Sequence, residues 1–193
     1  MEQLTTPHPF KKGSIHTLSI DSLALGGKGI ANVNDFIIFV ERSLPGQIVE
    51  ARIVKKKKKY AEARVQKILK QSPHAVPAPC PHFGVCGGCL LQNLDYEKQI
   101  AYKQQQVQET LEHIGGFREI NVLPIVPSPD TYFYRNKMEF SFSNQRWLTK
   151  EEIDSDSEII EKEFALGLHV PRRFDKVLDL QKCYLLSEFR NDI

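Results

Sequence analysis

The sequence predicts a mixed fold, in which a small closed β-barrel precedes an α+β domain that carries a cysteine-rich loop. In the first third of the chain, short apolar segments alternate with glycine and proline turns, a pattern typical of short strands. A proline-rich stretch then interrupts this pattern, and a cysteine cluster, a helical repeat of apolar residues and further strand patterns follow it. We therefore expect two domains, at residues 8–72 and 76–193.

The strands of the first domain are predicted from runs of apolar and β-branched residues. Residues 15–21 alternate weakly between apolar and polar side chains, and residues 36–40 (FIIFV) are continuously apolar. A fourth and a fifth strand are expected at 47–54 and 60–69. Five short strands without a helix favour a barrel of the oligonucleotide-binding (OB) kind, because closure removes the edges that so short a sheet would expose.

A linker and a helix are predicted next. Residues 71–79 (QSPHAVPAP) carry three prolines and no apolar period, which is typical of a linker. A helix is expected to begin after Asp95, whose side chain can cap it, and to end at Gly115 and Gly116. Between these limits apolar residues recur at the three-, four- and seven-residue spacing of one helix face.

The remaining elements of the second domain are predicted from shorter patterns. Strict alternation over residues 134–142 predicts a strand from which Arg135 and Lys137 project on the same face. The acidic segment 150–163 is expected to be an exposed loop, and 164–170 another strand.

Three of the four cysteines lie within ten residues, in the stretch CPHFGVCGGC that spans residues 80–89. In C-x2-C two intervening residues let both thiolates face one metal site, and the glycines between Cys86 and Cys89 permit the close backbone approach that this requires. Cys80 can reach the same site. For the fourth ligand the sequence offers Cys183, with His82 and His74 as substitutes. The spacing alone does not choose between zinc and an iron–sulfur cluster.

The composition is that of a globular chain that stays in a reducing compartment. Apolar residues make up 41% of the sequence, enough for a core. No stretch approaches the roughly 18 consecutive apolar residues of a membrane helix, and the start MEQLTTPHPFKK lacks the apolar region of a secretory signal. We expect a cytoplasmic, monomeric protein without a membrane partner, whose cysteines are metal ligands or redox groups rather than disulfides.

Positive charge is concentrated in the first third of the chain. Residues 1–79 hold 13 Lys and Arg against 6 Asp and Glu, whereas the rest holds 13 against 18. The run at 55–59 places five lysines beside Tyr60, a combination that attracts phosphates and offers an aromatic face to a base. Such a run can also serve only to keep a loop solvated, but other basic residues of the same predicted barrel favour nucleic acid, and single-stranded or irregular RNA suits the barrel best. The predicted RNA-binding residues are Lys11, Lys12, Lys28, Lys55, Lys56, Lys57, Lys58, Lys59, Tyr60, Arg64, Arg135 and Lys137.

Three stretches together resemble the bacterial 23S ribosomal RNA uracil-5-methyltransferases. They are residues 13–65, from GSIHTLSID to KKKKKYAEARV, residues 80–107 (CPHFGVCGGCLLQNLDYEKQIAYKQQQV), and YRNKMEFSF at 134–142 followed by the distant Cys183. The resemblance implies that the first domain is a TRAM domain, which is an OB barrel. It also implies a [4Fe-4S] cluster held by Cys80, Cys86, Cys89 and Cys183, which shapes the RNA-binding surface and takes no part in methyl transfer.

The resemblance further implies S-adenosylmethionine-dependent formation of 5-methyluridine in 23S rRNA. Family members carry the S-adenosylmethionine loop, a cysteine that attacks C6 of uracil and a carboxylate base in a further domain. We find no candidate for these groups here, and therefore assign no catalytic residue. We expect an amino-terminal portion of a longer enzyme that is inactive by itself. The alternatives are a stand-alone zinc-binding RNA-recognition module and, less well matched to the pattern, a redox protein that uses Cys86 and Cys89.

Overall fold

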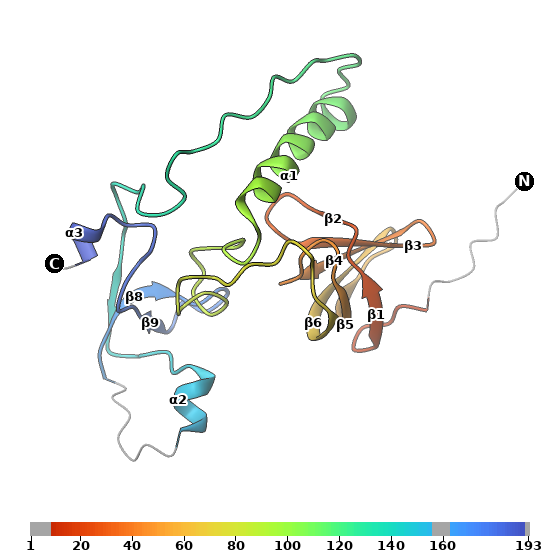
Figure 1. The fold of residues 1–193 in the computed structure, drawn as a ribbon. Helices are drawn as coiled ribbons and strands as arrows, with labels where there is room; N and C mark the ends of the chain where they lie inside the picture. Colours follow the sequence, from red (N-terminus) through yellow and green to blue (C-terminus); the bar gives the residue numbers. More distant parts are fainter. Residues whose placement is uncertain (1–8, 156–162, 192–193) are drawn as a thin grey trace, which may run out of the picture. The chain divides into compact units, whose positions relative to one another are not determined.

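Two separate β-sheets organise the described part of the chain, residues 9–155 and 163–191 of the computed structural model (Figure 1). The contacts between residues divide the chain into two compact units. The first runs to Val76 and includes Leu94–Ile125, and the second comprises Pro77–Asn93 and the chain from Val126 onwards. No helix in the described ranges is long and apolar enough to cross a membrane.

The first unit is built on a six-stranded sheet with the order β1-β5-β6-β4-β3-β2. The neighbouring strands pair antiparallel, except β4 and β6, which run parallel. Figure 1 shows these strands in red to yellow. Their bounds are β1 (Ile15–Ser19), β2 (Ser22–Leu23), β3 (Gly29–Val33), β4 (Phe36–Glu41), β5 (Ile48–Lys56) and β6 (Tyr60–Lys70).

The prediction of a closed five-stranded barrel is wrong in both strand number and closure. The strands predicted at 15–21, 36–40, 47–54 and 60–69 are present as β1, β4, β5 and β6, but the turn at residues 25–28 is flanked by two short strands, β2 and β3. Within the described residues no ladder joins β1 to β2, so the sheet has two open edges. One reason is that β2 is only two residues long and is already paired with β3.

The core of the first unit lies on one face of this sheet. Strand β4 alternates buried and half-buried residues along its whole length, as a strand covered on one side must. The Phe10 ring stacks on Phe36 with ring centroids 5.5 Å apart, so the chain before β1 closes part of the core. The buried cluster consists of Phe10, Leu18, Ile20, Ala31, Phe36, Ile38, Val40, Val49, Ala51, Ile53, Ala61 and Ala63.

A helix, α1 (Tyr96–Glu109), also belongs to the first unit and continues into a short π-helical turn, η1 (Thr110–Ile114). The Asp95 carboxylate accepts a hydrogen bond from the Lys98 N–H and so caps the helix, as the sequence predicts. The Gln106 side chain donates to the Leu23 carbonyl at 2.7 Å and ties α1 to β2. The domain limits predicted from sequence, 8–72 and 76–193, assign this helix to the second domain, and those limits stay a prediction.

The second unit is built on a three-stranded antiparallel sheet with the order β7-β8-β9. Gly167 lies in β8 where a Cβ atom would be 2.1 Å from the Leu178 carbonyl oxygen, so only glycine allows β8 and β9 to pair here. Two short helices complete the unit. The bounds are β7 (Ser141–Ser143), α2 (Lys150–Asp154), β8 (Ala165–His169), β9 (Val177–Asp179) and α3 (Glu188–Asn191).

Two predictions for the second unit need correction. Of the strand predicted at 134–142, only Ser141 and Phe142 lie in a strand, β7, and Arg135 makes an isolated β-bridge to Leu186. The side chains of residues 134–137 are all exposed, so this part of the segment has no buried strand face. The loop predicted at 150–163 contains α2, which starts with a capping box between Thr149 and Glu152. Residues 156–162 of that segment lie outside the described residues. The strand predicted at 164–170 is present as β8.

Candidate functional site

The cysteine-rich stretch folds as a series of tight turns within the second unit. The Phe83 N–H donates to the Cys80 carbonyl, and the Cys86 N–H donates to the His82 carbonyl. The Gly88 N–H then donates to the Cys86 sulfur at 3.3 Å, an arrangement that orients the sulfur within C-x2-C. Buried Gln92 accepts a hydrogen bond from the Cys80 N–H at 3.3 Å and so fixes the start of the stretch.

All four cysteines line one small pocket, with an enclosed volume of about 20 Å³. They come from two parts of the chain, since Cys80, Cys86 and Cys89 lie in the turns and Cys183 follows β9. All four are half-buried and none forms a disulfide. Burial raises the pKa of the Cys80 and Cys86 thiols, and the nearby Cys89 and Cys183 raise it further. The fold therefore brings together the residues that the sequence singles out as a ligand set.

The thiols are gathered but are not arranged around a single ion. In the described residues no group of three or more His, Cys, Asp or Glu side chains is placed to hold one metal ion. This finding is compatible with the shared pocket. Four ligands of one zinc ion lie about 2.3 Å from a common centre. The four thiolates of a [4Fe-4S] cluster each bond a different iron and stand farther apart.

Of the two histidines considered as substitutes for Cys183, one already accepts a hydrogen bond and the other belongs to the first unit. The His82 Nε2 accepts a hydrogen bond from the Gln181 N–H at 3.3 Å, which occupies the nitrogen that would otherwise face a metal. Burial lowers the pKa of His82 below its ordinary value, and this effect is larger than the opposite effect of Asp179. The ring is therefore neutral at neutral pH, as the acceptor role of Nε2 requires. His74 belongs to the first unit, where its carbonyl accepts from the Asp95 N–H.

Asn191 in α3 holds the turn that carries Cys183. Its Oδ1 accepts from the Cys183 N–H at 2.8 Å, and its Nδ2 donates to the Cys183 carbonyl at 3.1 Å and to the carbonyls of Leu186 and Ser187 at 3.2 Å. Sequence reasoning missed this residue, because no spacing or residue type marks an asparagine eight positions from a cysteine as its support. The pocket lining from Met138 and Leu168 was missed for the same reason.

The lysine run lies at the end of the β5–β6 hairpin. Lys55 and Lys56 end β5, Tyr60 begins β6, and the three lysines between them form the connection, closed by a hydrogen bond from the Lys57 N–H to the Tyr60 carbonyl at 2.8 Å. All five lysine side chains are exposed. The half-buried Tyr60 packs edge-on against Phe39, with ring centroids 5.7 Å apart. We refer to Lys57, Lys58 and Lys59 as the lysine loop.

Two glutamates neutralise part of the positive charge predicted to bind RNA. Glu62 in β6 lies 3.0 Å from both Lys28 Nζ and Lys55 Nζ. Glu41 at the end of β4 lies 3.2 Å from Arg64 and 3.9 Å from Lys28. The hydrogen bonds from Lys28 and Lys55 lower the pKa of Glu62, so the carboxylate stays ionised at neutral pH. Across the described chain, the lysine loop makes no ion pair that would offset its charge in this way.

The remaining predicted RNA-binding residues fall on both units. Lys11 and Lys12 are exposed in the turn before β1. Arg135 and Lys137 are exposed on the segment before β7 and border the same pocket of the second unit, although not from a strand. Lys137 pairs with Glu139 at 2.7 Å, and Arg135 donates to the Met138 sulfur at 3.5 Å.

The first unit contains a known domain. Residues 9–66 match the TRAM domain, a span that covers β1 to β5 and the first half of β6. The match therefore includes the lysine loop, Tyr60 and Arg64, and it ends before the cysteine-rich stretch.

Curated relatives match most of this chain and carry one kind of name. The chain is 48% identical over 172 residues, or 89% of its length, to an uncharacterized RNA methyltransferase of Bacteroides thetaiotaomicron. It is 45% identical over 95% of its length to an uncharacterized RNA methyltransferase of Chlorobaculum tepidum. It spans 37% and 38%, respectively, of the length of these two relatives.

A solved structure has a similar fold. The tRNA (uracil-54, C5)-methyltransferase of Pyrococcus abyssi, in complex with S-adenosyl-L-homocysteine, aligns with 91% of this chain and 34% of its own, with a TM-score of 0.52 and 23% identity. At this identity the likeness establishes a shared fold, and it extends beyond the TRAM domain into the second unit.

Proposed function

We propose that this chain is the RNA-binding and iron–sulfur region of an S-adenosylmethionine-dependent RNA methyltransferase that forms 5-methyluridine in 23S rRNA. The observation that carries the proposal is the TRAM domain at residues 9–66 within a chain whose relatives are named RNA methyltransferases over about nine-tenths of its length. The structural neighbour acts on a uracil C5 of tRNA, which supports uracil as the target base. The choice of 23S rRNA comes from the sequence resemblance.

The lysine loop is the proposed centre of RNA binding. Its ammonium groups are exposed at the tip of a hairpin, where several phosphates of one strand can approach together. Lys28, Lys55 and Arg64 lie on strands beside it, but their charges are shared with Glu41 and Glu62. We therefore assign them a smaller contribution than the lysine loop.

The four cysteines are the proposed ligands of a [4Fe-4S] cluster. They fit such a group chemically, since Fe–S clusters are held by cysteine thiolates and the same pocket is lined by four of them. When bound, the cluster would supply a covalent link between the cysteine-rich stretch and the segment after β9. The residues themselves would position these two segments, with Asn191 and Gln92 holding the backbone of Cys183 and Cys80.

Methyl transfer is proposed to occur outside the residues described here. C5 of uracil is a weak nucleophile until a thiolate adds to C6, so the reaction needs a free cysteine beside the base. All four cysteines of this chain are assigned to the cluster. We propose that the S-adenosylmethionine site and the attacking cysteine lie in the part of the relatives that this chain does not match.

RNA binding is tested with the purified chain and fluorescently labelled RNA. Replacing Lys57, Lys58 and Lys59 with Gln should reduce the slope of log affinity against log salt by about 2, since each phosphate contact on a single strand contributes about 0.7. The matched control replaces Lys67, Lys70 and Lys103, which are also exposed lysines of the first unit, and should leave the slope close to that of the wild type. Equal slopes for both variants would refute the assignment. A fragment of 23S rRNA should compete more strongly than tRNA.

The cluster is tested by metal analysis after anaerobic purification. We expect a brown protein with about four irons and an equal amount of sulfide per chain, and a loss of both on Cys183→Ser. A colourless protein with one zinc would instead support a zinc-binding RNA-recognition module. A Cys183→Ser variant that keeps full iron and sulfide would remove Cys183 from the ligand set.

A further inference from the structure

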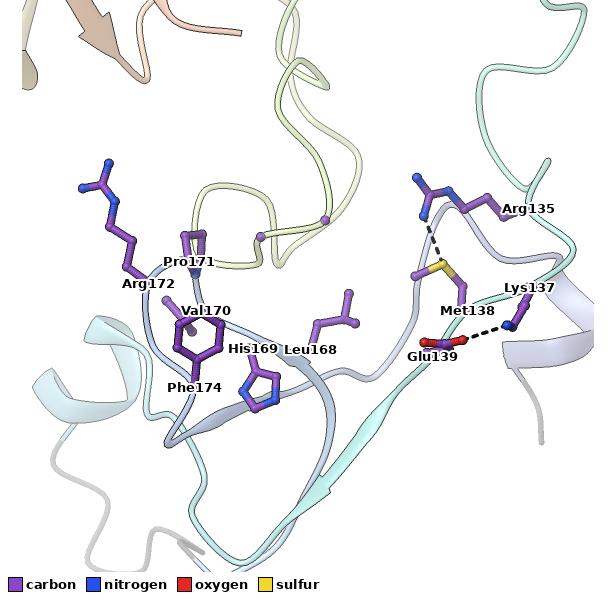
Figure 2. Close-up of a pocket in the computed structure, with 12 residues that line it drawn as sticks. Arg135, Lys137, Met138, Glu139, Leu168, His169, Val170, Pro171, Arg172 and Phe174 are labelled. Carbon is purple, nitrogen blue, oxygen red and sulfur yellow. Dashed lines mark hydrogen bonds and ion pairs between the residues drawn. The ribbon is translucent and has the colours of Figure 1, made fainter. Parts of the chain in front are cut away.

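A second, larger pocket lies in the second unit. Its volume is about 580 Å³, within the range of pockets that hold small ligands. Figure 2 shows the segment with Arg135, Lys137 and Glu139 on one side and the turn with Pro171 and Phe174 on the other. Gly87 and Gly88 of the cysteine-rich stretch also line it.

The lining combines positive charge with an exposed aromatic ring. Phe174 is 86% exposed, so its ring is accessible to a base that enters the pocket. Arg135 makes no ion pair within the described ranges, and the only carboxylate of the lining, on Glu139, pairs with Lys137. The side chains of Lys137 and Glu139 are 81% and 80% exposed, so this ion pair is weak and a phosphate can compete for the Lys137 ammonium group.

The pocket shares a wall with the four cysteines. Gly88, Met138 and Leu168 line both pockets. A Cβ atom on Gly87 would lie 3.3 Å from the His169 carbonyl and from the Pro171 ring, so the cysteine-rich stretch packs directly on the turn that leads to Phe174. The position of this turn therefore depends on the stretch that carries three of the cysteines.

We propose that this pocket binds one unpaired nucleotide of the RNA, with its base stacked on Phe174 and a phosphate held by Arg135 and Lys137. Bases stack on any flat aromatic face, and guanidinium and ammonium groups hold the phosphates beside them. A base can reach the ring only where it is not paired, so the pocket selects single-stranded RNA over a duplex. This inference rests on the proposed function in requiring that the protein binds RNA, and it adds a specific site made of other residues than the lysine loop.

The test uses the whole 193-residue chain with a short single-stranded uridine oligonucleotide and an RNA duplex as probes. Phe174→Ala should weaken binding of the single strand about 10-fold without changing the salt slope, since stacking releases no counterions. Phe174→Tyr keeps a flat ring and should keep the wild-type affinity. Arg135→Gln with Lys137→Gln should instead lower the slope by about 1.4, the value for two phosphate contacts on a single strand. Duplex affinity should be the same for the wild type and Phe174→Ala.

The control is Phe142→Ala, which removes another phenylalanine of the second unit that is 74% exposed and lies outside the pocket lining. It should bind the single strand as the wild type does. If Phe174→Ala keeps the wild-type affinity while the Gln variant of the lysine loop loses its salt slope, the pocket proposal is overturned and RNA binding stands. If the wild-type chain binds neither probe, the proposed function and the pocket fail together. An equal loss in Phe142→Ala and Phe174→Ala also overturns the pocket, because the effect would then not be specific to its lining.

Discussion

Replacing Glu62 with Gln should change stability and RNA affinity in opposite directions. The Glu62 side chain is 18% exposed and its carboxylate lies 3.0 Å from the Lys28 ammonium, whose side chain is 34% exposed. Loss of this partly shielded ion pair should lower the free energy of unfolding by about 0.5–1 kcal/mol, the upper half of the range for exposed ion pairs. For a unit of this size the melting temperature should fall by about 4 °C. The pair with Lys55, whose side chain is 50% exposed, is left out of this figure.

The same substitution releases the Lys55 ammonium group and leaves Lys28 with only the longer contact to Glu41, at 3.9 Å, so both can contact phosphate more readily. RNA affinity should therefore rise together with the salt slope. Glu50→Gln is the matched control, because it removes one negative charge from the neighbouring strand β5 at a side chain that makes no ion pair among the described residues. If Glu50→Gln raises the affinity as much as Glu62→Gln, the effect is one of net charge only and the reasoning from the ion pairs is refuted.

The stability difference between the wild type and Glu62→Gln should also depend on pH. Because Lys28 and Lys55 lower the pKa of Glu62 from its ordinary value of 4.5, the carboxylate stabilises the folded state above that value. This contribution is lost as the pH falls through the lowered pKa of the folded state. Melting curves of the two proteins should therefore differ at pH 7 and converge in strong acid. A difference in melting temperature that stays constant from pH 7 down to strong acid would contradict the assignment of Glu62 to these ion pairs.

Two further substitutions probe the second unit. Gly167→Ala should destabilise this unit by about 3 kcal/mol or more, since its Cβ would lie 2.1 Å from the Leu178 carbonyl oxygen. Thermal melting and limited proteolysis measure this, with Ser141→Ala, at the position paired with Gly167 on β7, as the control, and a wild-type melting curve for Gly167→Ala would contradict the described register. Asn191→Ala should speed the loss of iron to a chelator about 10-fold, because it removes the hydrogen bonds that hold the Cys183 turn. Iron loss at the wild-type rate would show that the turn needs no such support.

Local patterns in the sequence were enough for the long strands but not for their assembly. Each of the strands β4, β5 and β6 has a continuously apolar or an alternating pattern, which fits a strand and does not fit a helix. β2 is too short to carry a pattern, and β3 begins with a glycine, so no strand range is predicted at either position. The parallel pairing of β4 with β6 and the open edges are properties of the whole sheet, to which no single segment points.

The residues of the candidate site also fall into those that the sequence could identify and those that it could not. The cysteines could be identified because their residue type and spacing carry the chemistry, and the fold brings all four to one pocket. The alternation around Arg135 and Lys137 led to a strand that is too long, since Arg135 makes only an isolated β-bridge to Leu186 and the side chains of 134–137 are all exposed. Glu62 and Asn191 were missed because no residue type or spacing in the sequence marks Glu62 as the partner of Lys28 or Asn191 as the support of Cys183.

The measurement that tests the central proposal most directly is the amount of 5-methyluridine in 23S rRNA from cells with and without the gene. Mass spectrometry of digested 23S rRNA and tRNA should show that one 5-methyluridine of 23S rRNA is lost without the gene and restored by the wild-type gene. A gene in which Lys57, Lys58 and Lys59 are replaced with Gln should restore it only in part, while 5-methyluridine in tRNA stays unchanged throughout. Unchanged 23S rRNA, or a loss confined to tRNA, would contradict the proposal.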